Sequence, residues 1–71
     1  MSNFAQQLGK KIKLMRVIND TSQEELSFKA GCDQSYLSRV ESGAVNITVK
    51  KLNDIALALE CKLTELIPEE N

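Results

Sequence analysis

Few side chains in this 71-residue sequence could take part in covalent or metal chemistry. Histidine and tryptophan are absent, which excludes histidine-based catalytic triads and histidine-ligated metal sites. Cys32 and Cys61 are 29 positions apart, whereas a structural zinc site usually has four closely spaced ligands. Free cysteine most often packs as a small hydrophobic residue. We therefore expect two buried thiols, no metal, no cofactor and no enzymatic activity, with an enzyme built on one thiol as a rival hypothesis.

Residues 34–42 carry side chains suited to a different chemistry, the reading of DNA bases. In a helix, Leu37, Val40 and part of Tyr36 would face the core. The outward face would then carry Gln34, Ser35, Ser38, Arg39 and Ser42. In the major groove a glutamine amide can pair with adenine, an arginine with guanine, and a serine hydroxyl with either. This face therefore has the composition of a base-reading helix, and an ordinary solvated helix surface is the alternative.

The segments before this face have the apolar spacing of helices. A first helix is predicted over about residues 3–19. Its inward stripe consists of Phe4, Leu8, Ile12 and Met15. Ser22 and Glu25 form a capping box at the start of a second helix, which Gly31 stops. Two short helices joined by a tight turn at a glycine outline a helix-turn-helix motif at about residues 22–42.

Two further helical segments are predicted after the motif. Asp33 is placed to cap the helix that Gly43 ends, and Thr48 is placed to cap the next one. The inward stripe of this fourth helix consists of Val49, Leu52, Ile55, Ala56 and Leu59. A last helical turn, around residues 63–67, ends at Pro68 because proline cannot continue it.

The sequence predicts a single all-α domain. No segment alternates with a period of two over enough residues for a strand. No linker or internal repeat divides the chain, and no apolar run approaches the roughly 18 residues of a membrane-spanning helix. The expected architecture is a compact domain of five short helices over residues 1–71, with an acidic tail at 68–71.

Resemblance to the Cro/cI-like (XRE) helix-turn-helix regulators extends over about residues 8–67. It is carried by the run SQEELSFKAGCDQSYLSRVESG, followed by NITVKKLNDIALALECKLTEL. The resemblance implies a lambda-repressor-like domain whose helix 34–42 enters the major groove of DNA. It implies a sequence-specific transcriptional regulator that binds a palindromic double-stranded DNA operator as a homodimer. Such a regulator acts in the cytoplasm, on the nucleoid of a bacterium or on a phage genome, without a membrane or a small-molecule ligand.

The resemblance also assigns roles to individual residues. The positions that usually reach bases are Gln34, Ser35, Ser38 and Arg39. The positions that often contact phosphates are Gln23, Tyr36, Ser42 and Asn46. The C-terminal positions expected in a dimer interface are Leu59, Leu63 and Ile67. Arg16 and Glu41 match a buried salt bridge between the first and third helices, and removal of one partner should cost about 3–5 kcal/mol.

The sequence departs from the family pattern at a few positions. Asp20 and Thr21 stand where the family often has glycine and leucine, and we expect Ile18 to supply part of the lost packing. Glu60 stands where glycine commonly ends the fourth helix. These substitutions affect the local geometry that we expect at two helix ends and leave the predicted fold unchanged.

Two alternatives to a general regulator remain open. The restriction-modification controller proteins are a similar subgroup, although many of them carry arginine at the position of Val45. The other alternative is a protein-interaction or antitoxin module with little DNA binding, which would use Leu14, Val17 and Phe28 as its contact surface. Binding to random-sequence DNA at low salt would separate a DNA-binding protein from such a module.

The charge of the chain is unusual for a DNA-binding protein, because its net value is −1 and nucleic-acid binders are usually basic. The charge is unevenly divided: residues 1–53 sum to +3, and residues 54–71 sum to −4. The acidic excess therefore lies in the tail, beyond the proposed DNA face. We expect weak non-specific DNA affinity and a shallow salt dependence, so that base contacts and dimerisation contribute much of the binding.

Overall fold

The computed structural model describes residues 3–69, which form four α-helices and one short 3-10 helix. The elements are α1 (Phe4–Ile18), α2 (Gln23–Ala30), α3 (Gln34–Ser42), α4 (Val49–Ala58) and η1 (Leu63–Glu65). The all-α prediction is confirmed, although the fifth predicted helix is only a 3-10 turn. Residues 70 and 71 of the predicted acidic tail lie outside the described residues.

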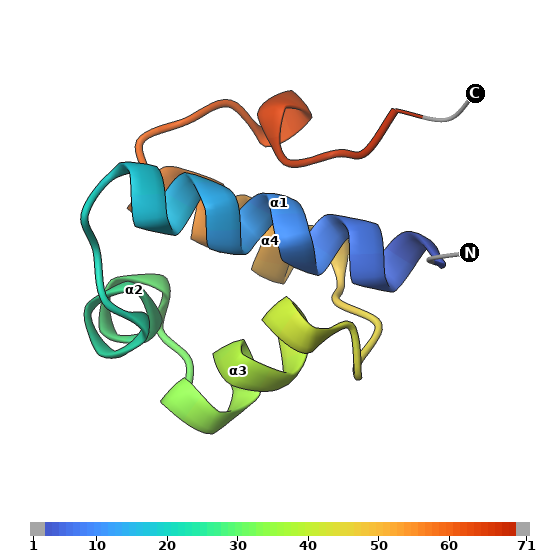
Figure 1. The fold of residues 1–71 in the computed structure, drawn as a ribbon. Helices are drawn as coiled ribbons and strands as arrows, with labels where there is room; N and C mark the ends of the chain where they lie inside the picture. Colours follow the sequence, from blue (N-terminus) through green and yellow to red (C-terminus); the bar gives the residue numbers. More distant parts are fainter. Residues whose placement is uncertain (1–2, 70–71) are drawn as a thin grey trace.

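The helices are arranged around α1, which crosses the middle of the molecule (Figure 1). α3 packs against α1, and α2 packs against both α3 and α4. The C-terminal segment, with η1 packed on α4, runs along the side of α1 opposite to α3 (Figure 1). One long surface of α3 therefore has no other helix over it.

The largest side chains of the hydrophobic core come from all four α-helices and from the residue after η1. The largest fully buried side chains are Ile12, Leu26, Leu37, Ile55 and Leu66. The first four lie on α1 to α4, and Leu66 directly follows η1. Burial of a side chain of this size contributes about 1.5–3 kcal/mol, so the short C-terminal turn is fastened to the domain through Leu66.

Three predictions about apolar side chains are wrong. Val49 is 72% exposed and Phe4 is also exposed, although both belong to predicted inward stripes. Each is the first residue of its helix, so it lies at the end of the stripe, where packing against the neighbouring helix has not begun. Ile18, at the last position of α1, is 65% exposed and does not supply the packing expected of it.

Side-chain caps fix the beginnings of most helices. The Ser22 hydroxyl accepts from the Glu25 amide at 3.0 Å, and the Glu25 carboxylate accepts from the Ser22 amide at 3.1 Å, which confirms the capping box. These bonds lower the pKa of Glu25, because they stabilise its ionised form. Thr48 caps α4 as predicted. Asp33 occupies the N-cap position of α3, but its side chain makes no cap hydrogen bond, so that prediction is wrong.

Four described residues have a left-handed backbone, and two of them are not glycine. Gly31 and Gly43 end α2 and α3 with φ angles of 73° and 80°. Asp20 and Glu60 have φ angles of 53° and 56°, at the two helix ends where the sequence lacks an expected glycine. The chain therefore makes both turns with residues whose Cβ atoms crowd this conformation.

Candidate nucleic-acid interface

The outward face of α3 presents polar side chains that are not occupied within the protein. Its exposed residues include Gln34, Ser35, Ser38 and Arg39. Within the described residues, the side chains of these four form no hydrogen bond or ion pair. Their donors and acceptors are therefore free for an external partner. The outward orientation of these four side chains is the one expected from the sequence.

The opposite face of α3 is fixed by very close packing against α1. Leu37 and Val40 are buried there. Gly9 of α1 meets the α3 backbone directly: a Cβ atom added to Gly9 would lie 2.3 Å from the carbonyl oxygen of Val40 and 2.6 Å from that of Glu41. This role of Gly9 was not predicted from the sequence. The available signal was a glycine beside Leu8 on the inward side of an otherwise regular helix.

The two glycines that flank α3 have different surroundings. A Cβ atom on Gly43 would lie 2.5 Å from Cγ of Gln6, so the turn after α3 is packed against the start of α1. A Cβ atom on Gly31 would meet nothing within 4 Å. Gly31 is needed only for its left-handed backbone, whereas Gly43 is needed both for its backbone and for the space that it leaves.

A buried ion pair joins α1 to the end of α3, as the family resemblance implies. Nε of Arg16 lies 2.7 Å from Oε2 of Glu41, and Nη2 lies 3.1 Å from Oε1. The two side chains are 13% and 4% exposed. The remaining guanidinium nitrogen, Nη1, donates to the carbonyl oxygen of Thr21 at 2.9 Å. The pair thus also anchors the loop between α1 and α2.

The residues expected to contact phosphates lie in different settings. Ser42 and Asn46 are exposed, and Tyr36 is half-buried. The Ser42 hydroxyl donates to the carbonyl oxygen of Arg39 at 3.0 Å, which leaves its oxygen free to accept. The amide of Gln23 donates to Oε1 of Glu41 at 3.0 Å. The hydrogen bond between Gln23 and Glu41 was not predicted from the sequence.

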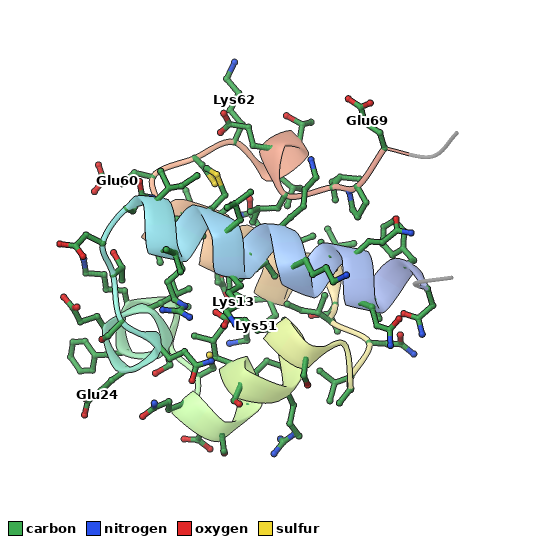
Figure 2. All side chains as sticks on the ribbon, in the orientation of Figure 1. Lys13, Glu24, Lys51, Glu60, Lys62 and Glu69 are labelled. Atoms are coloured by element: carbon green, nitrogen blue, oxygen red, sulfur yellow. The ribbon has the colours of Figure 1, made fainter. Side chains whose placement is uncertain are left out.

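Two lysines of α1 and two glutamates of the C-terminal segment lie in different parts of the molecule. Lys10 and Lys13 line a shallow hollow between α1 and the end of α3, together with Gln6, Glu41 and Ser42. Glu60 and Glu69 lie on the C-terminal segment, on the side of α1 away from α3 (Figure 2). The separation is incomplete, because Lys62 lies on the same C-terminal segment and Glu24 lies on α2, which packs against α3 (Figure 2).

Lys50 and Lys51, near the start of α4, are partly engaged within the protein. The Nζ atoms of both lie within 4 Å of the Asp54 carboxylate, at 3.6 Å and 3.8 Å. Lys51 also donates to the carbonyl oxygen of Gly31 at 3.4 Å, just beyond the end of α2. Their charges are therefore partly balanced before any phosphate approaches.

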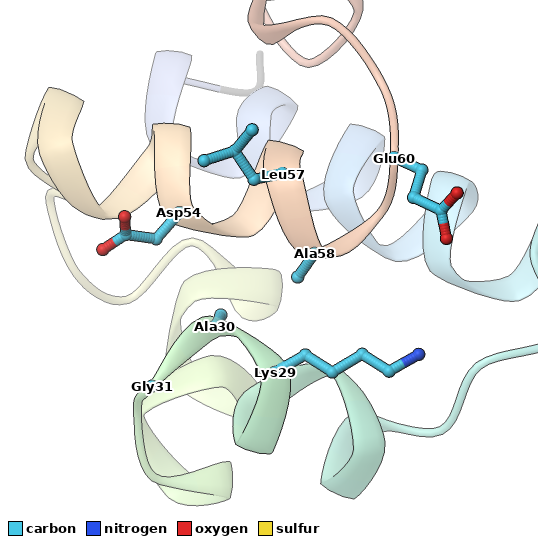
Figure 3. A pocket seen from close by; sticks show the side chains of 7 residues that line it. All are labelled: Lys29, Ala30, Gly31, Asp54, Leu57, Ala58 and Glu60. Carbon is cyan, nitrogen blue, oxygen red and sulfur yellow. The ribbon is translucent and has the colours of Figure 1, made fainter.

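A second hollow lies between α2 and α4 (Figure 3). Lys29 and Gly31 line it from the α2 side, and Asp54 and Leu57 line it from α4, with Glu60 at its edge. It is open to solvent, and the side chain of Lys29 extends across it toward the side of Glu60 (Figure 3). No cysteine lines this hollow, so it offers no nucleophilic thiol.

The two thiols have no arrangement that suggests chemistry. Cys32 and Cys61 are free and only half-buried, so the expectation of two buried thiols is wrong. Burial raises the pKa of both thiols, which keeps them in the less reactive neutral form. The described residues contain no cluster of three or more acidic or cysteine side chains that could hold a metal ion. Among the same residues, no helix is long and apolar enough to cross a membrane.

One of the three residues expected in a dimer interface is unavailable for it. Leu59 is 4% exposed and belongs to the core, so its assignment to the interface is wrong. The four-residue spacing placed it correctly on an apolar stripe, but that stripe faces the protein interior. Leu63 and Ile67 are half-buried against the core and keep part of their apolar surface exposed.

The fold and this surface together define a helix-turn-helix DNA-binding domain, with α2 and α3 as its two helices. The helix-turn-helix family model HTH_3 matches residues 12–66 of the chain. The chain belongs to this family of DNA-binding transcriptional regulators.

Individual relatives agree with this assignment. The HTH-type transcriptional regulator SlrR of Bacillus subtilis is 36% identical over 64 residues, which are 89% of this chain and 42% of SlrR. The chain thus spans less than half the length of that relative. The control protein C.MunI of a Mycoplasma species is 30% identical over 70 residues, which are 97% of this chain and 95% of C.MunI.

A solved structure is similar over nearly the same range. The restriction-modification controller protein C.AhdI of Aeromonas hydrophila superimposes with a TM-score of 0.87 at 32% identity. The match covers 89% of this chain and 96% of C.AhdI. The arrangement of α1 to α4 is therefore also found in a regulator of about this size.

Proposed function

We propose that this protein is a sequence-specific transcriptional regulator that binds a palindromic DNA operator as a homodimer, with α3 in the major groove. The observation that carries the proposal is the outward face of α3, on which the side chains of Gln34, Ser35, Ser38 and Arg39 have no partners within the described chain. A helix held rigidly on one face, with solvent-exposed donors and acceptors on the other, is suited to reading base edges. Such a regulator acts in the cytoplasm, on nucleoid or phage DNA.

The proposed contacts fall into two groups with different consequences. Gln34, Ser35, Ser38 and Arg39 read bases, and the phosphate contacts of residues around them fix the register of the domain on DNA. Lys10 and Lys13 border the same surface and add non-specific attraction. Sequence preference therefore depends on the first group, and salt dependence on the second.

Arg39 provides the sharpest test of base reading. Arg39→Ala should cost about 1–3 kcal/mol of operator affinity and relax the preference at one base pair in each half-site. Titration of labelled operators, with each base pair varied in turn, measures both effects. Lys29→Ala removes an exposed positive charge beside the hollow between α2 and α4, and it serves as the matched control. If Arg39→Ala weakens binding to all sequences equally, Arg39 contacts a phosphate and the assignment is wrong.

Homodimerisation is proposed to use the C-terminal segment. Leu63 and Ile67 are only partly buried. The C-terminal segment that carries them lies on the side of α1 away from α3, so pairing through this segment leaves α3 free (Figure 1). In such a dimer the two copies of α3 should lie about 34 Å apart, which is one turn of DNA. A small interface gives a weak dimer, so operator binding and dimer assembly should be coupled.

Sedimentation at several protein concentrations tests this interface. Ile67→Ser should shift the protein toward the monomer at concentrations where the wild type is dimeric, because it removes apolar area from the interface. Leu57→Ser changes an exposed leucine of α4 and should leave the association unchanged. Thermal unfolding of both variants checks that the domain stays folded. Equal association of the two variants would place the dimer interface elsewhere.

A restriction-modification controller protein is a second candidate function. It is favoured by the relatives C.MunI and C.AhdI, because the similarity covers 95% and 96% of those chains. Val45, which stands where many controllers have arginine, is half-buried against the core and offers no positive charge. Locating the selected operator sequence in the source genome tests this candidate: a controller should have its operator beside restriction and modification genes.

A protein-interaction module is the third candidate. It is favoured by exposed apolar side chains at Leu14, Val17 and Phe28. A gel shift on random-sequence DNA at low salt separates this candidate from the first two. Retardation of the DNA supports a regulator, and its complete absence supports a module that binds only protein.

A further inference from the structure

The buried Glu41 carboxylate makes one contact that the ion pair with Arg16 does not need. Its Oε1 atom accepts from Nη2 of Arg16 at 3.1 Å and also from Nε2 of Gln23 at 3.0 Å. Its Oε2 atom accepts from Nε of Arg16 at 2.7 Å. The first residue of α2 is thereby tied to the end of α3 through the carboxylate that also ties α3 to α1.

This contact decides which end of the Gln23 side-chain amide faces inward. An ionised carboxylate can only accept hydrogen bonds, so it binds the amide nitrogen and turns the amide oxygen away. The amide nitrogen carries two hydrogens, and Glu41 uses one of them. The other hydrogen remains a donor, held on a side chain whose rotation is already restricted.

We propose that Glu41 is a positioning residue for DNA binding, which holds the Gln23 amide so that its second hydrogen donates to a DNA phosphate. The inference rests on the proposed function and deepens it, because it gives the Arg16–Glu41 pair a second role besides joining α1 to α3. The anchored amide loses little rotational freedom on binding. Immobilising a free side chain of this kind costs about 0.5–1.5 kcal/mol, which corresponds to about two- to twelvefold in affinity.

A mutant cycle on operator affinity tests the coupling. Gln23→Ala is compared in the wild type and in an R16M/E41L background, where two apolar side chains of similar volume replace the ion pair and the domain is expected to stay folded. Gln23→Ala should weaken operator binding about tenfold in the wild type and less than about threefold in that background. Equal losses in both backgrounds would overturn the proposal, because a purely structural ion pair leaves the Gln23 contact unchanged.

A second measurement needs neither DNA nor a variant that might lose its fold. In the nuclear magnetic resonance spectrum of the wild-type protein, one of the two Gln23 side-chain amide hydrogens should exchange with solvent more slowly than the other. The exposed amide of Gln34 serves as the reference, because its side chain makes no hydrogen bond within the described residues. Equal exchange of the two Gln23 hydrogens, at the rate of Gln34, would contradict the contact with Glu41.

The two measurements separate this inference from the proposed function. If the wild type binds no operator, the proposed function fails and the phosphate contact fails with it. If the wild type binds its operator but the mutant cycle shows no coupling, only the positioning role of Glu41 is overturned. Operator binding together with coupling and one protected hydrogen is the result expected.

Discussion

The two sides of α1 are built in different ways. On the recognition side, formed by α1, α2 and α3, the backbones approach so closely at Gly9 that a methyl group would not fit, and a buried ion pair joins the helices. On the C-terminal side, formed by residues 60–69, the apolar residues Leu63 and Ile67 are only half-buried. The difference indicates a rigid surface where we propose that DNA is read, and incomplete burial where we propose that a second copy of the chain packs.

Breaking the ion pair should have the largest effect on the recognition side. Glu41→Leu or Arg16→Met alone should destabilise the domain by about 3–5 kcal/mol, because each leaves a charge buried without its partner. The R16M/E41L double variant should recover most of that loss, since it buries no charge. Urea unfolding of the four proteins measures these differences. A double variant that is as unstable as either single variant would show that the pair's geometry, and not an unpaired charge, controls stability.

Adding a side chain at Gly9 should cause the next largest loss of stability. Gly9→Ala should cost about 2–3 kcal/mol, because the added Cβ forces apart two backbones that cannot yield as a side chain would. Gly31→Ala is the matched control: it meets no neighbour, and only its φ of 73° opposes the change. We expect Gly31→Ala to destabilise the domain by about 1 kcal/mol. A Gly9→Ala protein that unfolds at the wild-type urea concentration would refute the close packing of α1 on α3.

Replacing Asp20 or Glu60 by glycine should have the smallest effect on the free energy of unfolding, and it should increase that free energy. Asp20→Gly and Glu60→Gly should each stabilise the domain by about 0.5–1 kcal/mol, since glycine adopts positive φ without crowding. The two turns are linked, because Nδ2 of Asn19 donates to the carbonyl oxygen of Leu59 at 3.1 Å. Asn53→Gly, at an exposed position within α4, should instead destabilise by a few tenths of a kcal/mol. Thermal unfolding that showed destabilisation by all three glycines would contradict the assignment of strain to these turns.

The residues that mark helix ends in this sequence predicted the bounds of α2 and α3 well. Ser22, Gly31 and Gly43 mark helix ends through side-chain and backbone rules that act within a few residues, and α2 and α3 begin and end where those rules place them. Periodicity was less informative about burial. It identified the stripe that contains Val49 and Leu59, but not which of its members would lie under a neighbouring helix.

The contacts that complete the candidate site depend on packing between distant segments. The approach of Gly9 to α3 and the bond from Gln23 to Glu41 join residues 18 or more positions apart. No local rule gives the distance between two helices, because that distance is set by all the side chains between them. The ion pair of Arg16 with Glu41 was anticipated through the family resemblance alone.

Selection of bound sequences from a random DNA pool tests the central claim most directly, since it reports base reading and symmetry together. The account predicts a palindrome whose half-site centres are about 10 base pairs apart, one turn of DNA, with relaxed preference at one position of each half-site for Arg39→Ala. Enrichment of no sequence would contradict the claim that α3 reads DNA bases, and an identical consensus from the wild type and Arg39→Ala would contradict the base contact of Arg39.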